Sequence, residues 1–193
     1  MIEVILLVFL LAKLKKLRIS CFFTKPVFYP ILLCELIHLV FQITIFCGNY
    51  TFVPYAAIIK RTYMFLMLIP LFAYKQVKTA LWGSACVFLG TFLNQFVMSQ
   101  NGGKMPVFPT LSLLTGYVKA DTFVGLTDIH VLGTQASHYI FLCDIFDLGY
   151  TILSLGDIFI HMFVFLTLYG TIKHFNSTGP ERKTEHHVKN QSV

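Results

Sequence analysis

The stretch TALWGSACVFLGTFLNQFVMSQNGGKMP, residues 79–106, decides the fold. Its first part, residues 79–98, carries no charged side chain, and about 20 apolar residues suffice for a helix to cross the hydrocarbon core of a bilayer. The polar, glycine-rich SQNGGKMP that follows ends such a helix, because glycine favours a helix C-terminus and proline cannot continue it. The stretch therefore predicts a membrane-spanning helix that opens into a loop at the membrane surface.

The composition of the whole chain agrees with a membrane protein. Of its 193 residues, 56% are hydrophobic and 12% are charged, and the mean hydropathy is +0.71. A soluble domain of this size carries more polar residues. Basic residues concentrate in residues 13–25 and near the C-terminal end, without the aromatic interleaving of a soluble nucleic-acid-binding module. Nucleic acid is therefore not expected as a partner.

Further apolar segments accompany residues 79–98, namely residues 2–12, 27–47, 52–74 and 152–172. The first is short, but it can extend to about position 17 if its lysines reach toward the surface. The sequence thus predicts an all-α membrane protein with five transmembrane helices, built as a single polytopic domain over residues 1–173. Residues 174–193 are polar and basic, and we expect them to form a disordered cytoplasmic tail.

The distribution of lysine and arginine orients this bundle. Basic segments mark the cytoplasmic side of membrane proteins, so residues 13–25 and the C-terminus are expected inside the cell. Counting crossings from there puts the N-terminus and the loop after residue 98 outside. Only one crossing then fits between residues 110 and 172, so residues 138–150 are expected to form a short re-entrant or interfacial segment.

Polar side chains are predicted to meet near the outer surface. The topology brings together the binding candidates Asn94, Asn101, Gly102, Gly103, Lys104 and His130, and the carboxylates Asp144 and Asp157. Gly102 and Gly103 allow positive φ angles, so that successive amides can surround an anion or a carbonyl oxygen. A helix C-cap followed by a turn is the alternative interpretation. We expect one outward-facing polar cleft for a lipid headgroup, a peptide or a partner membrane protein, and thus a non-enzymatic binding or accessory protein.

The two carboxylates also suit an intramembrane aspartyl hydrolase. Asp144 and Asp157, if held close, would share one proton, so that one acts as a base and the other as an acid. Asp147 competes with Asp144 for this role. In the structural alternative, the aspartates anchor the short segment at the interface, and Asp157 bonds His161 one helical turn later.

Ionisable residues also lie inside the predicted spans. Glu35 and His38 lie at the depth of Lys60 and Arg61 if the second and third spans are antiparallel neighbours. A structural ion pair between Glu35 and Arg61 is one interpretation, and a proton relay in a small proton-coupled transporter is the other. The cysteines are scattered without metal-ligand spacing, so neither a metal nor a cofactor is expected.

Several segments resemble a family of small bacterial integral membrane proteins catalogued as a domain of unknown function. They are LNQFVMSQNGGKMPV (93–107), HVLGTQAS (130–137), LCDIF (142–146) and LSLGDIF (153–159). The pattern of that family is Asn-Gly-Gly-Arg-Met-Pro followed by two Gly-Asp pairs. This chain has Lys104 in place of the arginine, and Cys143 in place of the glycine of the first Gly-Asp pair. The resemblance implies a bacterial cell membrane and no established activity.

A second resemblance concerns the acidic residues. Residues 101–103, Asp144 and Asp157 are similar to the Asn-x-Gly element and aspartate pair of lipoprotein signal peptidases. The likeness implies a peptidase for the hydrolase alternative, by analogy alone.

Overall fold

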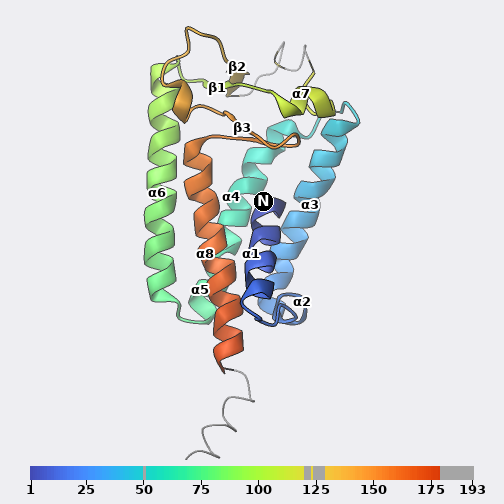
Figure 1. Ribbon diagram of the computed structural model, residues 1–193, viewed down its shortest axis with the longest axis vertical. Helices are drawn as coiled ribbons and strands as arrows, with labels where there is room; N and C mark the ends of the chain where they lie inside the picture. Colours follow the sequence, from blue (N-terminus) through green and yellow to red (C-terminus); the bar gives the residue numbers. More distant parts are fainter. Residues whose placement is uncertain (50, 120–122, 124–128, 179–193) are drawn as a thin grey trace, which may run out of the picture.

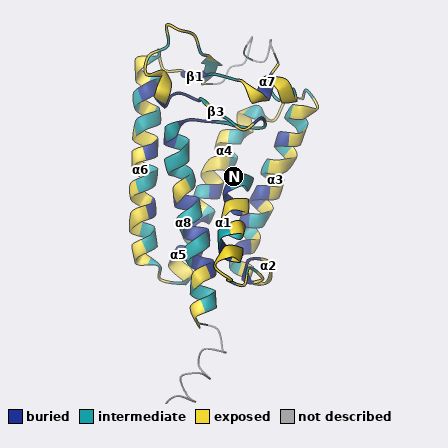
Figure 2. Ribbon diagram, viewed as in Figure 1, coloured by how far each residue is buried: buried dark blue, intermediate teal, exposed yellow. Residues whose placement is uncertain are grey.

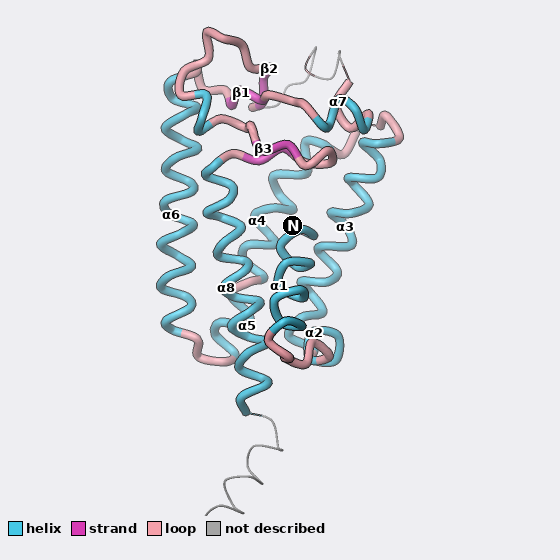
Figure 3. Tube along the Cα trace, in the orientation of Figure 1, coloured by secondary structure: helices cyan, strands magenta, loops and turns pink. Residues whose placement is uncertain are grey.

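The computed structural model describes residues 1–49, 51–119, 123 and 129–178. Long helices run along the longest axis of the molecule, and short strands and loops form a cap across one end (Figure 1, Figure 3). Within the described residues, four helical stretches have the length and composition of a membrane span, namely Pro26–Phe46, Val53–Ala73, Val77–Gln100 and Leu155–Thr178. The chain thus has the features of a multi-pass membrane protein.

Helices make up most of the bundle. The α-helices are α1 (Ile2–Leu14), α2 (Cys21–Thr24), α3 (Tyr29–Phe46), α4 (Ala56–Leu66), α5 (Leu68–Ala73), α6 (Val77–Gln100), α7 (Leu111–Thr115) and α8 (Leu155–Thr178). The 3-10 helices are η1 (Pro26–Phe28), η2 (Val53–Tyr55) and η3 (Ile140–Leu142). Prolines at the first turns of η1, α3 and η2 suit these positions, because proline lacks the N–H that a helix start leaves unpaired.

Helix α1 does not cross the bundle. Its 13 residues span about 20 Å, whereas a hydrocarbon core is about 30 Å thick. Figure 1 places the N-terminus between the two ends of the bundle, and α1 ends beside α2 at the end opposite the cap. The prediction of five transmembrane helices is therefore not confirmed, and the expected position of the N-terminus outside the cell stays a prediction. The helix stops where Lys16 takes a positive φ of 55°.

Helices α6 and α8 pack against each other at small residues. A Cβ atom added at Gly90 would overlap the carbonyl oxygen of Gly156, and one added at Gly83 would overlap the ring of Phe163. Small residues let helix backbones approach closely within a membrane. The close approach brings Asn94, one turn beyond Gly90, against the start of α8.

Many residues along the long helices are exposed (Figure 2), and numerous large hydrophobic residues are among them. Large exposed hydrophobic residues include Leu10 on α1, Phe72 on α5, and Trp82, Phe88 and Phe92 on α6. A soluble protein rarely exposes such continuous apolar surface, whereas a bilayer accommodates it. This surface supports the assignment of the long helices to a membrane.

The cap contains short strands that the all-α prediction missed. Strand β1 (Met105–Val107) pairs in parallel with β2 (His130–Leu132), and β3 (Phe146–Asp147) pairs antiparallel with β4 (Ile152–Leu153). Val107 also forms a β-bridge with Asp144. Residues 138–150, which were predicted to be re-entrant or interfacial, contain η3 and β3 and belong to the cap at the end of the bundle.

The opposite end of the bundle is strongly basic. Its exposed basic residues in the described part of the chain are Lys13, Lys15, Lys16, Arg18, Lys25, Lys75, Lys78 and Lys173, and no described acidic residue lies among them. Residues 174–178 of the predicted tail belong to α8, and the remaining tail residues lie outside the described residues.

Candidate functional site

A pocket of about 200 Å³ lies between the cap-side ends of α3 and α4 and the cap itself. Its polar wall consists of His38, Gln42, Lys60, His130, Asp144 and Thr151. Aromatic rings line it as well, from Phe41, Tyr117 and Phe123. The pocket therefore joins hydrogen-bonding groups to apolar walls, which is the usual make-up of a small-molecule site.

Asp144 is the most buried polar group of this pocket. The residue is 3% exposed, and its Oδ2 atom lies 3.6 Å from Nε2 of His130. Its other oxygen, Oδ1, is buried and has no hydrogen-bond partner within the described ranges. The backbone of Asp144 is fixed to β1, because its N–H donates to Pro106 O at 3.1 Å and its carbonyl accepts from Phe108 N at 2.9 Å. An unpaired, rigidly held carboxyl oxygen is a ready hydrogen-bonding group for a ligand.

The surroundings of Asp144 favour its neutral form. Burial raises the pKa of the carboxyl group to about 7, and the negative charge of Asp157 acts in the same direction. The positive charges of His130 and Lys60 oppose this shift. Near neutral pH, Asp144 therefore exists both as a hydrogen-bond donor and as a carboxylate.

Asp157 has a structural role at the start of α8. Its backbone N–H donates to Ser154 Oγ at 2.9 Å, and its Oδ2 accepts from Ser154 N at 3.3 Å, which is a capping box. Its Oδ1 accepts from Asn94 Nδ2 at 3.2 Å, and Ser154 Oγ donates to Asn94 Oδ1 at 2.8 Å. Both candidates, Asn94 and Asp157, thus serve to join α6 to α8.

The geometry does not support a catalytic pair of Asp144 and Asp157. No hydrogen bond joins the two carboxyl groups in the described structure, and Asp157 does not line the pocket that Asp144 lines. Two carboxyl groups that act as acid and base on one water must both reach it. Asp157 has committed both oxygens to Asn94 and Ser154, so it is not available for that role.

Asp147 organises the cap instead of competing for the pocket. Its Oδ2 accepts from Thr110 N at 2.6 Å, from Ser112 N at 2.9 Å and from Ser112 Oγ at 2.7 Å, and its Oδ1 accepts from Gly149 N at 2.8 Å. Burial alone would raise the pKa of Asp147, but the hydrogen bonds from Ser112, Thr110 and Gly149 together lower it. The carboxylate holds α7 and the β3–β4 turn together.

The Asn101-Gly102-Gly103 segment is a helix C-cap. Gly102 and Gly103 have φ angles of 63° and 78°, and the N–H groups of Asn101 and Gly103 both donate to Met98 O. The Asn101 side chain bonds His138 N at 2.9 Å and His138 O at 3.0 Å. Amides committed in this way do not form an anion site, and the exposed Lys104 lies outside the pocket. Of the residues predicted to line the cleft, His130 and Asp144 line the pocket, whereas Asn94, Asn101, Gly102, Gly103, Lys104 and Asp157 do not.

Glu35 and Arg61 do not form the predicted ion pair in the described structure. Arg61 is exposed, whereas Glu35 is 6% exposed and its carboxyl oxygen Oε1 lies 3.9 Å from the amino group of Met1. The N-terminal end of α1 lies beside Glu35, so the charged neighbour of Glu35 is the amino group of Met1 and not Arg61. The antiparallel pairing of α3 and α4 was therefore insufficient to predict which side chains meet.

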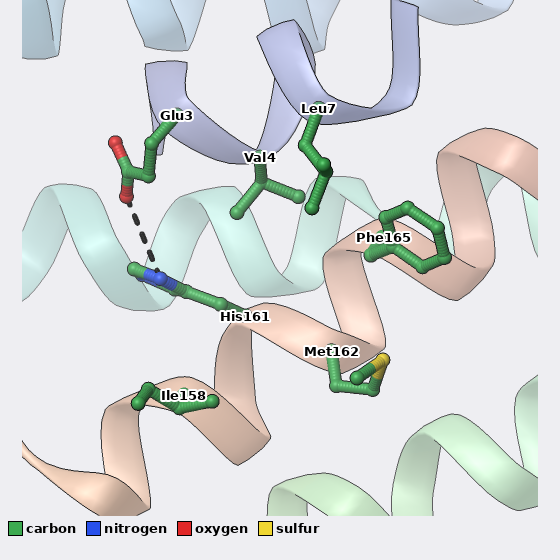
Figure 4. A pocket seen from close by; sticks show the side chains of 7 residues that line it. All are labelled: Glu3, Val4, Leu7, Ile158, His161, Met162 and Phe165. Atoms are coloured by element: carbon green, nitrogen blue, oxygen red, sulfur yellow. Dashed lines mark ion pairs between the residues drawn. The ribbon is translucent and has the colours of Figure 1, made fainter. Parts of the chain in front are cut away.

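His161 pairs with α1 instead of with Asp157. Its Nδ1 atom lies 3.5 Å from Oε1 of Glu3 (Figure 4). This pair stands at one end of an apolar groove of about 280 Å³ between α1 and α8, whose walls include Val4, Leu7 and Phe165. The groove has almost no polar surface apart from this pair.

Lys60 and Gln42 are pocket residues that the sequence analysis did not assign to the site. The sequence could have indicated Lys60, because a lysine inside an apolar span is energetically costly unless it faces a polar cavity or another charge. No feature of the sequence indicated Gln42, Tyr117 or Thr151, because such residues are common in spans and loops. Their convergence depends on how the cap folds back over α3 and α4.

The fold has the features of a multi-pass membrane protein, with a pocket of about 200 Å³ beneath the cap. The chain belongs to the family of unknown function DUF5317, whose model matches residues 20–169. Neither curated proteins nor solved structures provided a match.

Proposed function

We propose that this protein is a non-enzymatic binding protein of the membrane, which holds a small amphipathic molecule with an acidic head group in the pocket beneath the cap. The observation that carries the proposal is the pocket itself, which is lined both by the buried Asp144 and by apolar side chains of α3 and α4. A volume of about 200 Å³ limits the bound part to a few heavy atoms or a short stretch of chain.

The charges around the pocket favour an acidic head group. Lys60 supplies a positive charge, and His38 and His130 can each donate a hydrogen bond. Asp144 supports the same preference in its neutral form, because a protonated carboxyl group donates a hydrogen bond to a carboxylate or phosphate oxygen. The aromatic rings of Phe41 and Tyr117 provide contacts for the hydrocarbon part.

The orientation that we propose follows from the basic end of the bundle. Lysine and arginine collect on the cytoplasmic side of membrane proteins, so the cap and its pocket face the outside of a bacterial cell membrane. In this orientation the pocket lies near the outer leaflet, from which a lipid-like molecule would enter it. The protein would then serve as a lipid-binding accessory protein, alone or with a partner membrane protein.

Equilibrium binding of radiolabelled decanoate tests this function, with the full chain in lipid nanodiscs and empty nanodiscs as the background. We expect Lys60→Gln to weaken binding about tenfold, as the loss of a charged hydrogen bond does. Arg61→Gln is the matched control, because Arg61 neighbours Lys60 in sequence but does not line the pocket. Equal effects of the two variants, or displacement by uncharged decanol as effective as by decanoate, would contradict the proposal.

A further inference from the structure

A second group of ionisable residues lies deeper in the bundle. Glu35 is 6% exposed, and both of its carboxyl oxygens are buried without a hydrogen-bond partner among the described residues. Tyr63 is 1% exposed, and neither its hydroxyl group nor the buried Nδ1 of His38 has a hydrogen-bond partner in the described part of the chain. Polar atoms left without partners in an apolar interior are costly and call for a physical explanation.

Two helices link this interior group to the pocket. On α3, His38 lines the pocket and Glu35 lies one turn deeper on the same face. On α4, Lys60 lines the pocket and Tyr63 lies one turn deeper. The spacing of three residues on both helices thus places an interior group directly below each pocket residue.

Glu3 and Glu35 share few positively charged neighbours, and Glu35 is the less well compensated of the two carboxyl groups. Glu3 has the closer partners, because its Oε1 lies 3.1 Å from the amino group of Met1 and 3.5 Å from Nδ1 of His161. Among the described residues, the ion-pair partner of Glu35 is the amino group of Met1 at 3.9 Å. The titratable groups that act on Glu35 come from α1, α3, α4 and the cap, namely Glu3, the Met1 amino group, Cys34, Tyr63 and Tyr150.

We propose that Glu35 is a proton-binding site inside the bundle, and that its proton exchanges with the pocket through the imidazole of His38. The two side chains form no hydrogen bond with each other in the described structure, so the exchange requires them to come into hydrogen-bond contact. The O–H bond of Glu35 then breaks and an N–H bond forms at Nδ1 of His38, which yields a carboxylate and an imidazolium. The imidazolium then releases the proton on Nε2 to water in the pocket. The proposal concerns a site beyond the ligand pocket and does not require the acidic ligand to be correct.

Infrared difference spectroscopy of the full chain in nanodiscs tests the site. We expect a carboxylic-acid C=O band that loses intensity as the pH rises, that shifts when glutamate is labelled with ¹³C, and that disappears in Glu35→Gln. The band should remain in Asp144→Asn and in Glu3→Gln. Isotope labelling of the wild-type chain keeps the test valid even if Glu35→Gln fails to fold. A spectrum without a glutamate-sensitive band, or a band that persists in Glu35→Gln, would overturn the proposal.

The route through His38 has its own test. Transfer of the sample to D₂O should exchange the Glu35 proton for deuterium, and His38→Phe should slow this exchange about tenfold or more while the band itself remains. Gln42→Leu is the control, because Gln42 lines the pocket but carries no group that titrates. Exchange in His38→Phe at the wild-type rate would contradict the route. Loss of decanoate binding in Lys60→Gln with an unchanged band would leave the two sites independent.

Discussion

The Nε2 atom of His130 lies 3.6 Å from the Oδ2 atom of Asp144, and the two residues reach this contact from opposite sides of β1. Met105 pairs with His130 in the β1–β2 ladder, whereas Val107 forms a bridge with Asp144. A three-residue strand thus positions both His130 and Asp144 in the pocket wall. The site depends on the cap remaining folded over the bundle.

The raised pKa of Asp144 predicts how stability varies with pH. An acid with a higher pKa in the folded state binds its proton more tightly when folded, so the folded state is disfavoured as the pH rises from the unfolded value of 3.8 to about 7. The full effect is about 4 kcal/mol at most, at 1.36 kcal/mol per pH unit. We expect Asp144→Asn to flatten the fall in the thermal midpoint between about pH 4 and pH 8. A wild-type midpoint that rises with pH over this range, together with the same pH profile in Asp144→Asn, would refute the raised pKa of Asp144.

Asp144 also predicts pH-dependent binding. Below about pH 7 its neutral carboxyl group donates to an acidic head group, and above that pH its charge repels the ligand. Decanoate affinity should therefore fall as the pH rises through 7, and Asp144→Asn should lose most of this dependence, since asparagine stays neutral. The measurement is a series of binding isotherms across that range. Identical pH profiles for the two proteins would argue against contact between Asp144 and the ligand.

Asp147 should stabilise the cap in the opposite pH direction. An acid with a lowered pKa stabilises the folded state above its unfolded pKa, and this contribution is lost as the pH falls. Asp147→Ala removes the acceptor of the Thr110 and Ser112 amides, so we expect faster hydrogen exchange at these positions. Exchange along α6 should be unaffected. Protection at Thr110 that survives the substitution would contradict this role.

The contact between α6 and α8 should not tolerate added volume. Gly90→Ala would place a methyl group against the Gly156 carbonyl, and we expect a loss of about 1–3 kcal/mol in unfolding free energy, as in other overpacked cores. Gly102→Asn is the control, because asparagine accepts a positive φ and no atom lies within 4 Å of a Cβ there. Thermal unfolding in a mild detergent provides the comparison. Equal midpoints for the two variants would show that the helices do not meet at Gly90.

The hydrogen bonds of Asp157 predict a structural variant. Ser154→Ala removes the capping hydroxyl and should cost about 1 kcal/mol of stability, while decanoate affinity stays within about twofold of wild type. The same pattern is expected for Asp157→Asn. A tenfold loss of affinity in either variant, which is the loss expected for Lys60→Gln, would contradict a purely structural role and indicate that Asp157 contributes to ligand binding.

The long apolar segments predicted the four helices that have the length of a membrane span, and Gly102 predicted the end of α6. These features depend on local composition and backbone conformation, which the sequence shows directly. The length of α1 was misjudged, because snorkelling lysines allow a longer helix than the one that forms. The strands of the cap lie in a segment too short and too irregular to show the alternation of a sheet.

The candidate site was less predictable than the fold. Asp144 and His130 were identified as candidates from the sequence, and the structure places Nε2 of His130 3.6 Å from Oδ2 of Asp144. Asn94, Asn101 and Asp157 were placed in the same cleft, but each forms structural hydrogen bonds that depend on the rotation of α6 and α8 about their axes. Sequence spacing gives the face of a helix and not the neighbour that this face meets. The pairing of Glu3 with His161 was not predicted for the same reason, because the sequence did not indicate which helix packs against α1.

Photo-crosslinking with a diazirine derivative of decanoic acid tests most directly whether the pocket beneath the cap is occupied. The reaction uses the full chain in nanodiscs, and peptide mass spectrometry locates the adducts. The account predicts adducts on pocket residues such as Gln42, Ala56 and Tyr117, and their loss with excess decanoate or in Lys60→Gln. Adducts confined to lipid-facing residues such as Phe88 and Phe92, unchanged by excess decanoate, would contradict it.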